Sequence, residues 1–194
     1  SNEELYADVS IIGYNDREEQ KAIFAALTPV YLNLQNETIL DVGCGTGDYY
    51  AYIEEIIGFK RPHYTGIDYN DDMIQIAKNK FVDVPNFFEL ANFADFAGEF
   101  DWVIAGSIFN IKYYKEDSNT HLFNNIQKML TMCTKGISFN VLTKQIEQEE
   151  DSEGSWVIYT PYEVLETLMN QYPEYQVILN YNYLDGDCNF QIFK

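Results

Sequence analysis

A glycine-rich turn is the feature of this sequence with the clearest chemical meaning. Gly43, Gly45 and Gly47 alternate directly after the short apolar segment Thr38–Val42, and an amphipathic segment follows them. Glycines at these places let the backbone turn tightly and approach a ligand without a Cβ clash, while the following helix points its first amides at that ligand. The pattern predicts a strand, a ligand-binding turn and a helix, with a nucleotide-like molecule as the ligand.

A carboxylate follows the next predicted strand. Asp68 ends the segment Tyr64–Asp68 and lies 21 residues beyond Gly47. In doubly wound sheets an acidic side chain at this place accepts hydrogen bonds from both hydroxyls of a ribose. Asp68 could instead cap the following helix. Asn70 and Asp71 are equally suited to that role, so capping alone leaves Asp68 unexplained.

The residue after the third glycine limits the choice of ligand. A dinucleotide-binding turn has a glycine at the position of Asp48, and a carboxylate at the start of a helix disfavours a pyrophosphate there. A ligand that lacks phosphate and carries cationic groups suits this turn better. A nicotinamide oxidoreductase is disfavoured for this reason, and also because a helix is predicted before the first strand.

The charge balance restricts the partners. The chain has 194 residues, in which 12 lysines and arginines stand against 31 aspartates and glutamates, a net charge of −19. No cluster of basic residues offsets this charge, so neither a nucleic acid nor an anionic membrane surface is an expected partner. A small-molecule substrate is expected, and a basic protein substrate remains an alternative.

The cysteines and the apolar segments indicate the compartment. Cys44, Cys133 and Cys188 are far apart and form no CxxC pair, which argues against a disulfide framework or a zinc site. No apolar run approaches the roughly 20 residues needed to cross a bilayer. The sequence also lacks HExxH and GxSxG motifs, so no metal is expected. We expect a cytoplasmic protein.

The elements that position the turn and Asp68 alternate between strands and helices. Predicted strands are 38–42, 64–68, 86–90, 101–105, 136–142, 175–183 and 189–193. Predicted helices are 15–34, bent or split at Pro29, then 49–57, 71–81, a helix from Asp117 or Ser118 to Cys133, and one that begins at Thr160–Glu163 with a reciprocal cap. The short link 184–188 permits a hairpin but not a parallel crossover.

This order of elements predicts one α/β fold. The expected sheet is doubly wound and seven-stranded, mostly parallel with an antiparallel last strand, and has helices on both faces. We treat residues 1–194 as a single domain with an N-terminal helical segment over 1–34. The stretch Glu147–Gly154, with five acidic residues and no apolar one, is expected to be a surface loop.

Three segments together resemble the class I S-adenosylmethionine-dependent methyltransferases. Asp41–Gly47, the acidic Asp68 and the stretch Glu99–Ile104 carry the resemblance, which covers roughly residues 15–142. It implies a three-layer, Rossmann-like methyltransferase fold and S-adenosylmethionine as the cofactor. It also implies direct in-line methyl transfer by orientation and desolvation, without a covalent intermediate.

The resemblance further implies a set of cofactor contacts. The implied cofactor-binding residues are Asp41, Gly43, Cys44, Gly45, Gly47, Asp68, Tyr69, Met73, Asn92, Phe93 and Gly106. The segment up to Gly47 wraps the methionine part, carbonyls near Gly43 and Gly106 receive its ammonium group, and Asp68 holds the ribose. Cys44 serves as a small residue and not as a nucleophile.

The adenine contacts are implied in the same way and leave alternatives open. Tyr69 and Met73 flank the adenine, although Met73 fits ordinary core packing equally well. Asn92 accepts from the adenine amino group in place of the family's usual acidic side chain, or is a plain loop asparagine. The backbone amide of Phe93 donates to the ring.

The acceptor side is less defined. The segment Gly106–Ile111 is implied to line the methyl-transfer pocket and lacks the Asn/Asp-Pro-Pro-Tyr/Phe signature of nucleobase amino methyltransferases. Phe109 and Asn110 are candidate substrate contacts, although Asn110 could cap the next helix instead. In relatives the N-terminal helix often covers the cofactor. In this chain that would bring Tyr14, a third candidate substrate contact, together with Arg17 or Gln20, toward the methionine carboxylate.

Two functional hypotheses follow. The first is a methyltransferase that acts on a small molecule, and the second is a catalytically silent module that binds S-adenosylmethionine or S-adenosylhomocysteine. No catalytic base is assigned, because His63 and His121 are both expected to be surface or packing residues.

Overall fold

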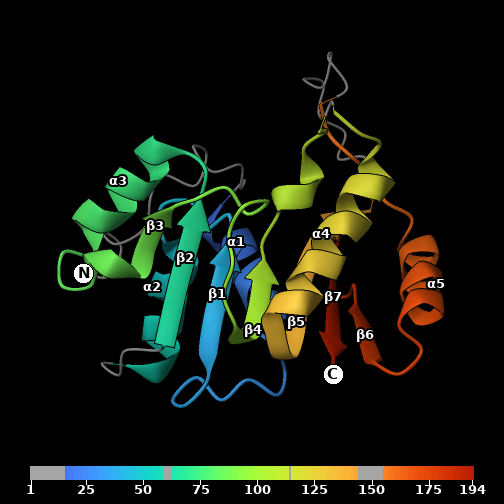
Figure 1. The fold of residues 1–194 in the computed structure, drawn as a ribbon, viewed down its shortest axis with the longest axis horizontal. Coiled ribbons are helices and arrows are strands. Elements are labelled where there is room, and N and C mark those ends of the chain that lie inside the picture. The colour runs from blue at the N-terminus through green and yellow to red at the C-terminus, as the bar shows by residue number, and fades with distance from the viewer. Residues whose placement is uncertain (1–15, 59–62, 114, 144–154) are drawn as a thin grey trace.

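A seven-stranded sheet lies between two layers of helices (Figure 1). The computed structural model describes residues 16–58, 63–113, 115–143 and 155–194. The strands are β1 Thr38–Val42, β2 His63–Asp68, β3 Phe88–Leu90, β4 Phe100–Ala105, β5 Cys133–Leu142, β6 Gln176–Asn180 and β7 Asp187–Phe193. The helices are α1 Arg17–Leu27, α2 Asp48–Ile57, α3 Asp71–Lys80, α4 Ser118–Met132 and α5 Pro161–Gln171, with short 3-10 turns η3 Pro85–Phe87 and η4 Ile108–Asn110.

The strand order is β3-β2-β1-β4-β5-β7-β6. Pairs among β1, β2, β3, β4 and β5 are parallel, and β7 runs antiparallel to both of its neighbours, β5 and β6. The predicted sheet, including the antiparallel last strand and the hairpin, is therefore confirmed.

Two hydrophobic cores hold the helices on the sheet. One core joins α1, α2 and α3 to one face, with Leu27, Ile53 and Ile74 buried in it. The other joins α4 and α5 to the opposite face, with Ile126 and Leu168 buried in it. In Figure 1, α4 lies in front of the sheet, α5 lies to the right beside β6, and α1 and α2 lie behind the sheet. The helical layers therefore cover both faces and leave the carboxyl edge of the parallel strands for a site.

The first helix is shorter than its apolar spacing predicts. Asp16 caps it by accepting from the Glu19 amide at 2.8 Å, and the helix ends at Leu27. Thr28 is extended (ψ 115°), as expected for a residue that precedes a proline. The predicted continuation to residue 34 is wrong, because Pro29 disfavours helical backbone at the residue before it.

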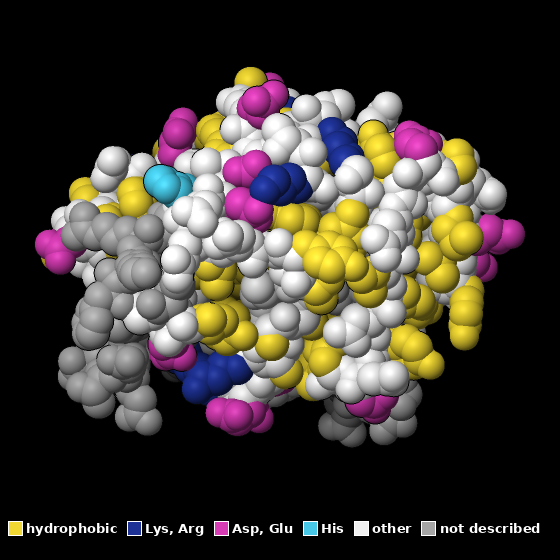
Figure 2. Space-filling model, turned by 90° about the horizontal axis from the view of Figure 1, so that it is seen from below, with side chains coloured by type: hydrophobic (Ala, Val, Ile, Leu, Met, Phe, Trp, Pro, Cys, Tyr) yellow, Lys and Arg dark blue, Asp and Glu magenta, His cyan; other side chains and the backbone are white. Residues whose placement is uncertain are grey.

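The residues beyond Pro29 lie at the amino edge of the sheet. Val30 and Tyr31 are 62% and 61% exposed, and the Tyr31 ring packs edge-on against Phe193, with ring centroids 4.9 Å apart. Figure 2 looks onto this edge and shows hydrophobic side chains gathered in the centre and right of the view. These side chains therefore face solvent at the edge opposite the glycine turn.

Two features near helix ends also differ from the prediction. Cys133 is the first residue of β5 and not the last apolar residue of α4. The helix α5 begins at Pro161 as predicted, but the Thr160 side chain forms no capping hydrogen bond. In the described part of the chain, no helix has the length and apolar character needed to span a membrane.

Candidate active site

The glycine turn connects β1 to α2 and is fixed to the end of β2. Gly43, Gly45 and Gly47 have φ angles of 75°, 53° and 79°, the left-handed region that glycine adopts with little strain. The amides of Gly43 and Cys44 both donate to the Ile67 carbonyl, at 2.8 and 3.0 Å. The turn therefore has one defined position at the carboxyl edge of the sheet.

The two sides of the turn differ in how much space they leave. A Cβ atom on Gly47 would lie 2.8 Å from both the Phe81 and the Phe88 rings, so this side packs closely on the core. A Cβ atom on Gly45 would meet no atom within 4 Å. Gly45 therefore marks the open side of the turn, where a ligand can approach the backbone.

The Asp68 carboxylate is hydrogen-bonded to the glycine turn. Its Oδ2 accepts from the Gly45 amide at 3.0 Å, and its Oδ1 accepts from the Asn70 amide at 2.8 Å. The cap of α3 is Asn70, whose side chain accepts from the Asp72 and Met73 amides. Asp68 is thus free of the capping role that the sequence left open. Its oxygens retain lone pairs for further donors.

Two buried groups lie close beneath the turn. Tyr64 Oη donates to Asp41 Oδ2 at 2.6 Å, and Asp41 is 3% exposed. Burial raises the pKa of Asp41 to about 7, and the charge of Asp68 adds to this rise while the bond from Tyr64 opposes it. Burial, together with Asp41 and Asp68, also raises the pKa of the Cys44 thiol, which makes this side chain a poor nucleophile.

A chain of polar contacts connects α1 to the start of α2. Asp48 is 3% exposed and forms an ion pair with Lys80, whose ammonium also donates to the Thr46 carbonyl at 3.3 Å. Gln20 Nε2 donates to Asp48 Oδ2 at 3.2 Å, and Arg17 donates to Gln20 Oε1. Asp48 is therefore satisfied within the protein. The sequence analysis did not identify Lys80, which lies 32 residues away.

One hydroxyl of the turn has no partner. Thr46 is 2% exposed, and its Oγ1 forms no hydrogen bond to any residue that the structure describes. A buried hydroxyl without a partner is unusual, so Thr46 Oγ1 is a polar atom of the turn that the described residues leave unsatisfied.

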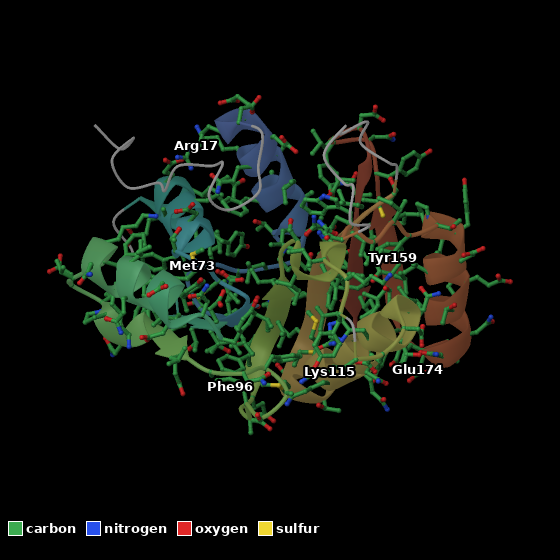
Figure 3. The ribbon with its side chains drawn as sticks, turned by 90° about the horizontal axis from the view of Figure 1, so that it is seen from above. Arg17, Met73, Phe96, Lys115, Tyr159 and Glu174 are labelled. Carbon is green, nitrogen blue, oxygen red and sulfur yellow. The ribbon has the colours of Figure 1, made fainter. Side chains whose placement is uncertain are left out.

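The residues implied to bind adenine lie beyond β2 and β3. Tyr69 is 82% exposed and Met73 is half-buried. Asn92 Oδ1 accepts from the Ala94 amide at 3.0 Å, so this amide oxygen already has a donor within its own loop. The Phe93 side chain is buried, with the Lys128 ammonium 5.0 Å from its ring centroid. In Figure 3, which looks onto the carboxyl edge, Met73 and Arg17 lie in the left half of the view.

The segment after β4 is the one that the sequence analysis assigned to the acceptor. Phe109 is 1% exposed and packs edge-on against Phe139. Asn110 Oδ1 accepts from the Leu142 amide at 3.0 Å, which fixes this segment to the end of β5. Asp117 caps α4, so the alternative in which Asn110 caps that helix is wrong. Tyr14 lies outside the described residues, as does the acidic stretch 147–154.

The two histidines lie apart from the turn. His63 is the first residue of β2, at the opposite edge of the sheet, and it is exposed. His121 Nδ1 lies 3.0 Å from Glu116 Oε1 in the first turn of α4, and the Tyr113 ring stacks on it with centroids 4.5 Å apart.

A buried polar cluster on β5 and β7 was not predicted. Asn140 on β5 donates to both carboxylate oxygens of Asp187 on β7, at 2.9 and 3.1 Å, and Tyr183 also donates to this carboxylate. Asn140 Oδ1 accepts from the Ser107 amide at 2.7 Å. The signal in the sequence is the alternation of polar and apolar residues over Ser138–Val141 and Asp187–Ile192, which the analysis did not use.

Comparisons with known proteins agree with this geometry. Residues 39–132 match the family model of a methyltransferase domain. No curated protein sequence matches the chain.

Solved structures share the whole fold at low sequence identity. Magnesium protoporphyrin IX methyltransferase from Synechocystis PCC 6803, solved with bound S-adenosylhomocysteine, matches 98% of this chain and 91% of its own at 12% identity and a TM-score of 0.68. The plantazolicin methyltransferase, also in complex with S-adenosylhomocysteine, matches 100% of this chain and 93% of its own at 16% identity and a TM-score of 0.68. An S-adenosylmethionine-dependent methyltransferase from Mesorhizobium loti matches 93% of this chain and 99% of its own at 12% identity and a TM-score of 0.66.

Proposed function

We propose that the chain is a class I S-adenosylmethionine-dependent methyltransferase that methylates a small molecule by direct in-line transfer; the match of residues 39–132 to a methyltransferase-domain model and the fold shared with solved methyltransferases support this proposal. The observation that carries the proposal is the 3.0 Å contact between the Gly45 amide and Asp68 Oδ2, at a glycine where a Cβ atom would meet nothing within 4 Å. The glycine turn and the Asp68 carboxylate, which comes from the adjacent strand β2, thus lie together at the carboxyl edge of the sheet.

The residues present fit the cofactor. Lone pairs on the Asp68 carboxylate are available to accept from ribose hydroxyls, and the Thr46 hydroxyl lacks a partner in the described residues. Carbonyls near Gly43 and Gly106 would receive the ammonium group, and the exposed Tyr69 ring would cover the adenine. When bound, S-adenosylmethionine supplies a methyl group on a positively charged sulfur, which is already activated for attack.

The remaining implied contacts are part of the same proposal. Gly47 and Cys44 shape the turn, Met73 borders the adenine from α3, and the Phe93 amide donates to the ring. Asn92 enters the proposal only through its second lone pair, because its amide oxygen already accepts from Ala94. These contacts position the cofactor, and the chain's catalytic contribution is orientation and exclusion of water.

The acceptor is proposed to be a small molecule. One structural neighbour is named for magnesium protoporphyrin IX, and the net charge of −19 disfavours anionic polymers. The three cysteines are unpaired and buried, which supports a reducing compartment, and we place the protein in the cytoplasm.

Two measurements test the proposal against its alternatives. Calorimetric titration should show binding of S-adenosylhomocysteine and no binding of NAD at the same concentrations; the opposite preference would favour an oxidoreductase. Incubation with methyl-labelled S-adenosylmethionine and fractions of small metabolites should then move label into an acceptor. Tight binding without acceptor-dependent transfer would support the silent module instead.

A further inference from the structure

The face of the sheet beneath α1 is polar where β5 and β7 pair. Five polar side chains on these strands are 3% exposed or less: Ser138, Asn140, Asp187, Asn189 and Gln191. Gln191 Nε2 donates to the Ala26 and Thr28 carbonyls at 3.0 and 3.3 Å, which places this face under α1 and gives Gln191 a structural role. The interleaved apolar side chains fill the core on the opposite face.

The cluster holds Ser107 in an unusual conformation. Ser107 directly follows Gly106 and has φ 61°, and it is the one non-glycine residue with positive φ in the described ranges. Its amide donates to Asn140 Oδ1 at 2.7 Å, and its hydroxyl lies 3.3 Å from Asn140 Nδ2. Glycine would adopt this conformation with less strain, and strained residues of this kind concentrate at functional sites. The serine places a hydroxyl at the end of β4.

The cluster has more acceptors than donors. The Asp187 carboxylate receives hydrogen bonds from Asn140 and Tyr183 and forms no ion pair within the described part of the chain. Asn189 lies opposite Asn140 in the β5–β7 pairing, and its Oδ1, on a side chain that is 0% exposed, has no partner among the described residues. A buried carboxylate and a buried amide oxygen both gain from a cationic donor.

The charges around Asp187 agree with this imbalance. Burial raises its pKa to about 6, the bonds from Tyr183 and Asn140 oppose the rise, and the charge of Glu19 on α1 adds to it. The surroundings thus disfavour the bare anion, which a bound cation would stabilise.

The position of the cluster fits the acceptor end of the site. Asp187 pairs with Leu142 at the end of β5, at the same edge as the glycine turn. In the strand order, β4 and β5 lie between β1 and β7, so β7 is three strand spacings, roughly 14 Å, from β1. A nucleoside over β1 and β2 therefore leaves the region over β4, β5 and β7 for the molecule that receives the methyl group.

We propose that Ser107, Asn140, Asp187 and Asn189 form the acceptor subsite and that it takes a small molecule with a protonated amine. This inference rests on the proposed function. An ammonium group would supply a positive charge to pair with the Asp187 carboxylate. It would also supply several N–H donors for that carboxylate and for Asn189 Oδ1. A neutral alcohol of the same shape supplies one donor and no charge.

The test uses the full chain saturated with S-adenosylhomocysteine, with methylammonium and benzylamine as probes and methanol and benzyl alcohol as neutral counterparts. Calorimetry should show at least tenfold tighter binding of each amine than of its alcohol. Asp187→Asn should remove this preference and change S-adenosylhomocysteine affinity less than twofold. Asp95→Asn, the same charge change at an exposed position, should leave both affinities unchanged.

A second variant and a second readout do not depend on how well Asp187→Asn folds. Ser107→Gly removes the hydroxyl and relieves the strained backbone, and it should lower amine affinity several-fold in a folded protein. Carbon-13 NMR of the Asp187 carboxyl should show a midpoint near pH 6 without amine and a lower midpoint with benzylamine bound.

The outcomes separate this inference from the proposed function. A wild-type chain that does not bind S-adenosylhomocysteine would overturn the proposed function itself. Normal cofactor binding with equal affinity for amines and alcohols would overturn only the amine subsite. Loss of S-adenosylhomocysteine binding in folded Asp187→Asn would also overturn it, because the carboxylate would then serve the cofactor's own ammonium group.

Discussion

Replacing Asp68 by alanine removes the carboxylate that is hydrogen-bonded to the glycine turn. In the structure this carboxylate accepts from the Gly45 and Asn70 amides, at 3.0 and 2.8 Å, and is oriented toward the place proposed for the ribose. A hydrogen bond to a charged acceptor contributes roughly 1.5–3 kcal/mol. The dissociation constant of S-adenosylhomocysteine should therefore rise about 10- to 150-fold, measured by calorimetry.

A matched variant and a matched ligand separate the ribose contact from general damage. Asp71→Ala removes the same charge three residues away at an exposed position and should change the affinity less than twofold. Adenosine should bind the wild type more tightly than 2′,3′-dideoxyadenosine, and Asp68→Ala should erase this difference. The reasoning is refuted if Asp68→Ala binds as well as the wild type, or if it weakens both nucleosides equally.

Three other changes test the surroundings of the turn. Gly47→Ala should destabilise the fold by about 3 kcal/mol in chemical denaturation, because its Cβ meets two aromatic rings at positive φ, whereas Gly45→Ala should cost about 1 kcal/mol yet abolish cofactor binding. Lys80→Met should destabilise by about 1.5–3 kcal/mol, because the buried Asp48 carboxylate loses its ion pair with the Lys80 ammonium; unchanged stability would contradict this role of the pair. Since the pKa of Asp41 rises from 3.8 to about 7 on folding, its contribution to stability should fall as pH rises through that window, and Asp41→Asn should flatten this part of the stability–pH curve.

The sheet was predictable because the residues that begin and end its strands are visible in the local sequence. Strands such as β1 and β4 are short apolar runs bounded by glycine or acidic residues, and the five-residue link before Asn189 permits only an antiparallel return. The predicted helix and strand boundaries were wrong where a steric effect or a contact distant in sequence determines the boundary. The apolar spacing of Val30 and Tyr31 is helical, but Pro29 directs the chain away from α1.

The site was predictable in the parts that one motif encodes. The glycine turn comes directly after β1, and Asp68 is the last residue of β2. Their contact at the carboxyl edge of the sheet could therefore be expected. The pairs Asp48–Lys80 and Asn140–Asp187 join residues 32 and 47 positions apart and depend on which strands and helices become neighbours. The alternation in the sequence indicates that β5 and β7 each have a polar face, but not which residues meet across them.

The most direct test of the central claim is a crystal structure of the chain with S-adenosylhomocysteine. The account predicts both ribose hydroxyls within hydrogen-bond distance of the Asp68 carboxylate, and the amino-acid part of the ligand against Gly45 and Thr46. A ligand elsewhere, or a ribose whose hydroxyls contact neither Asp68 oxygen, would contradict it.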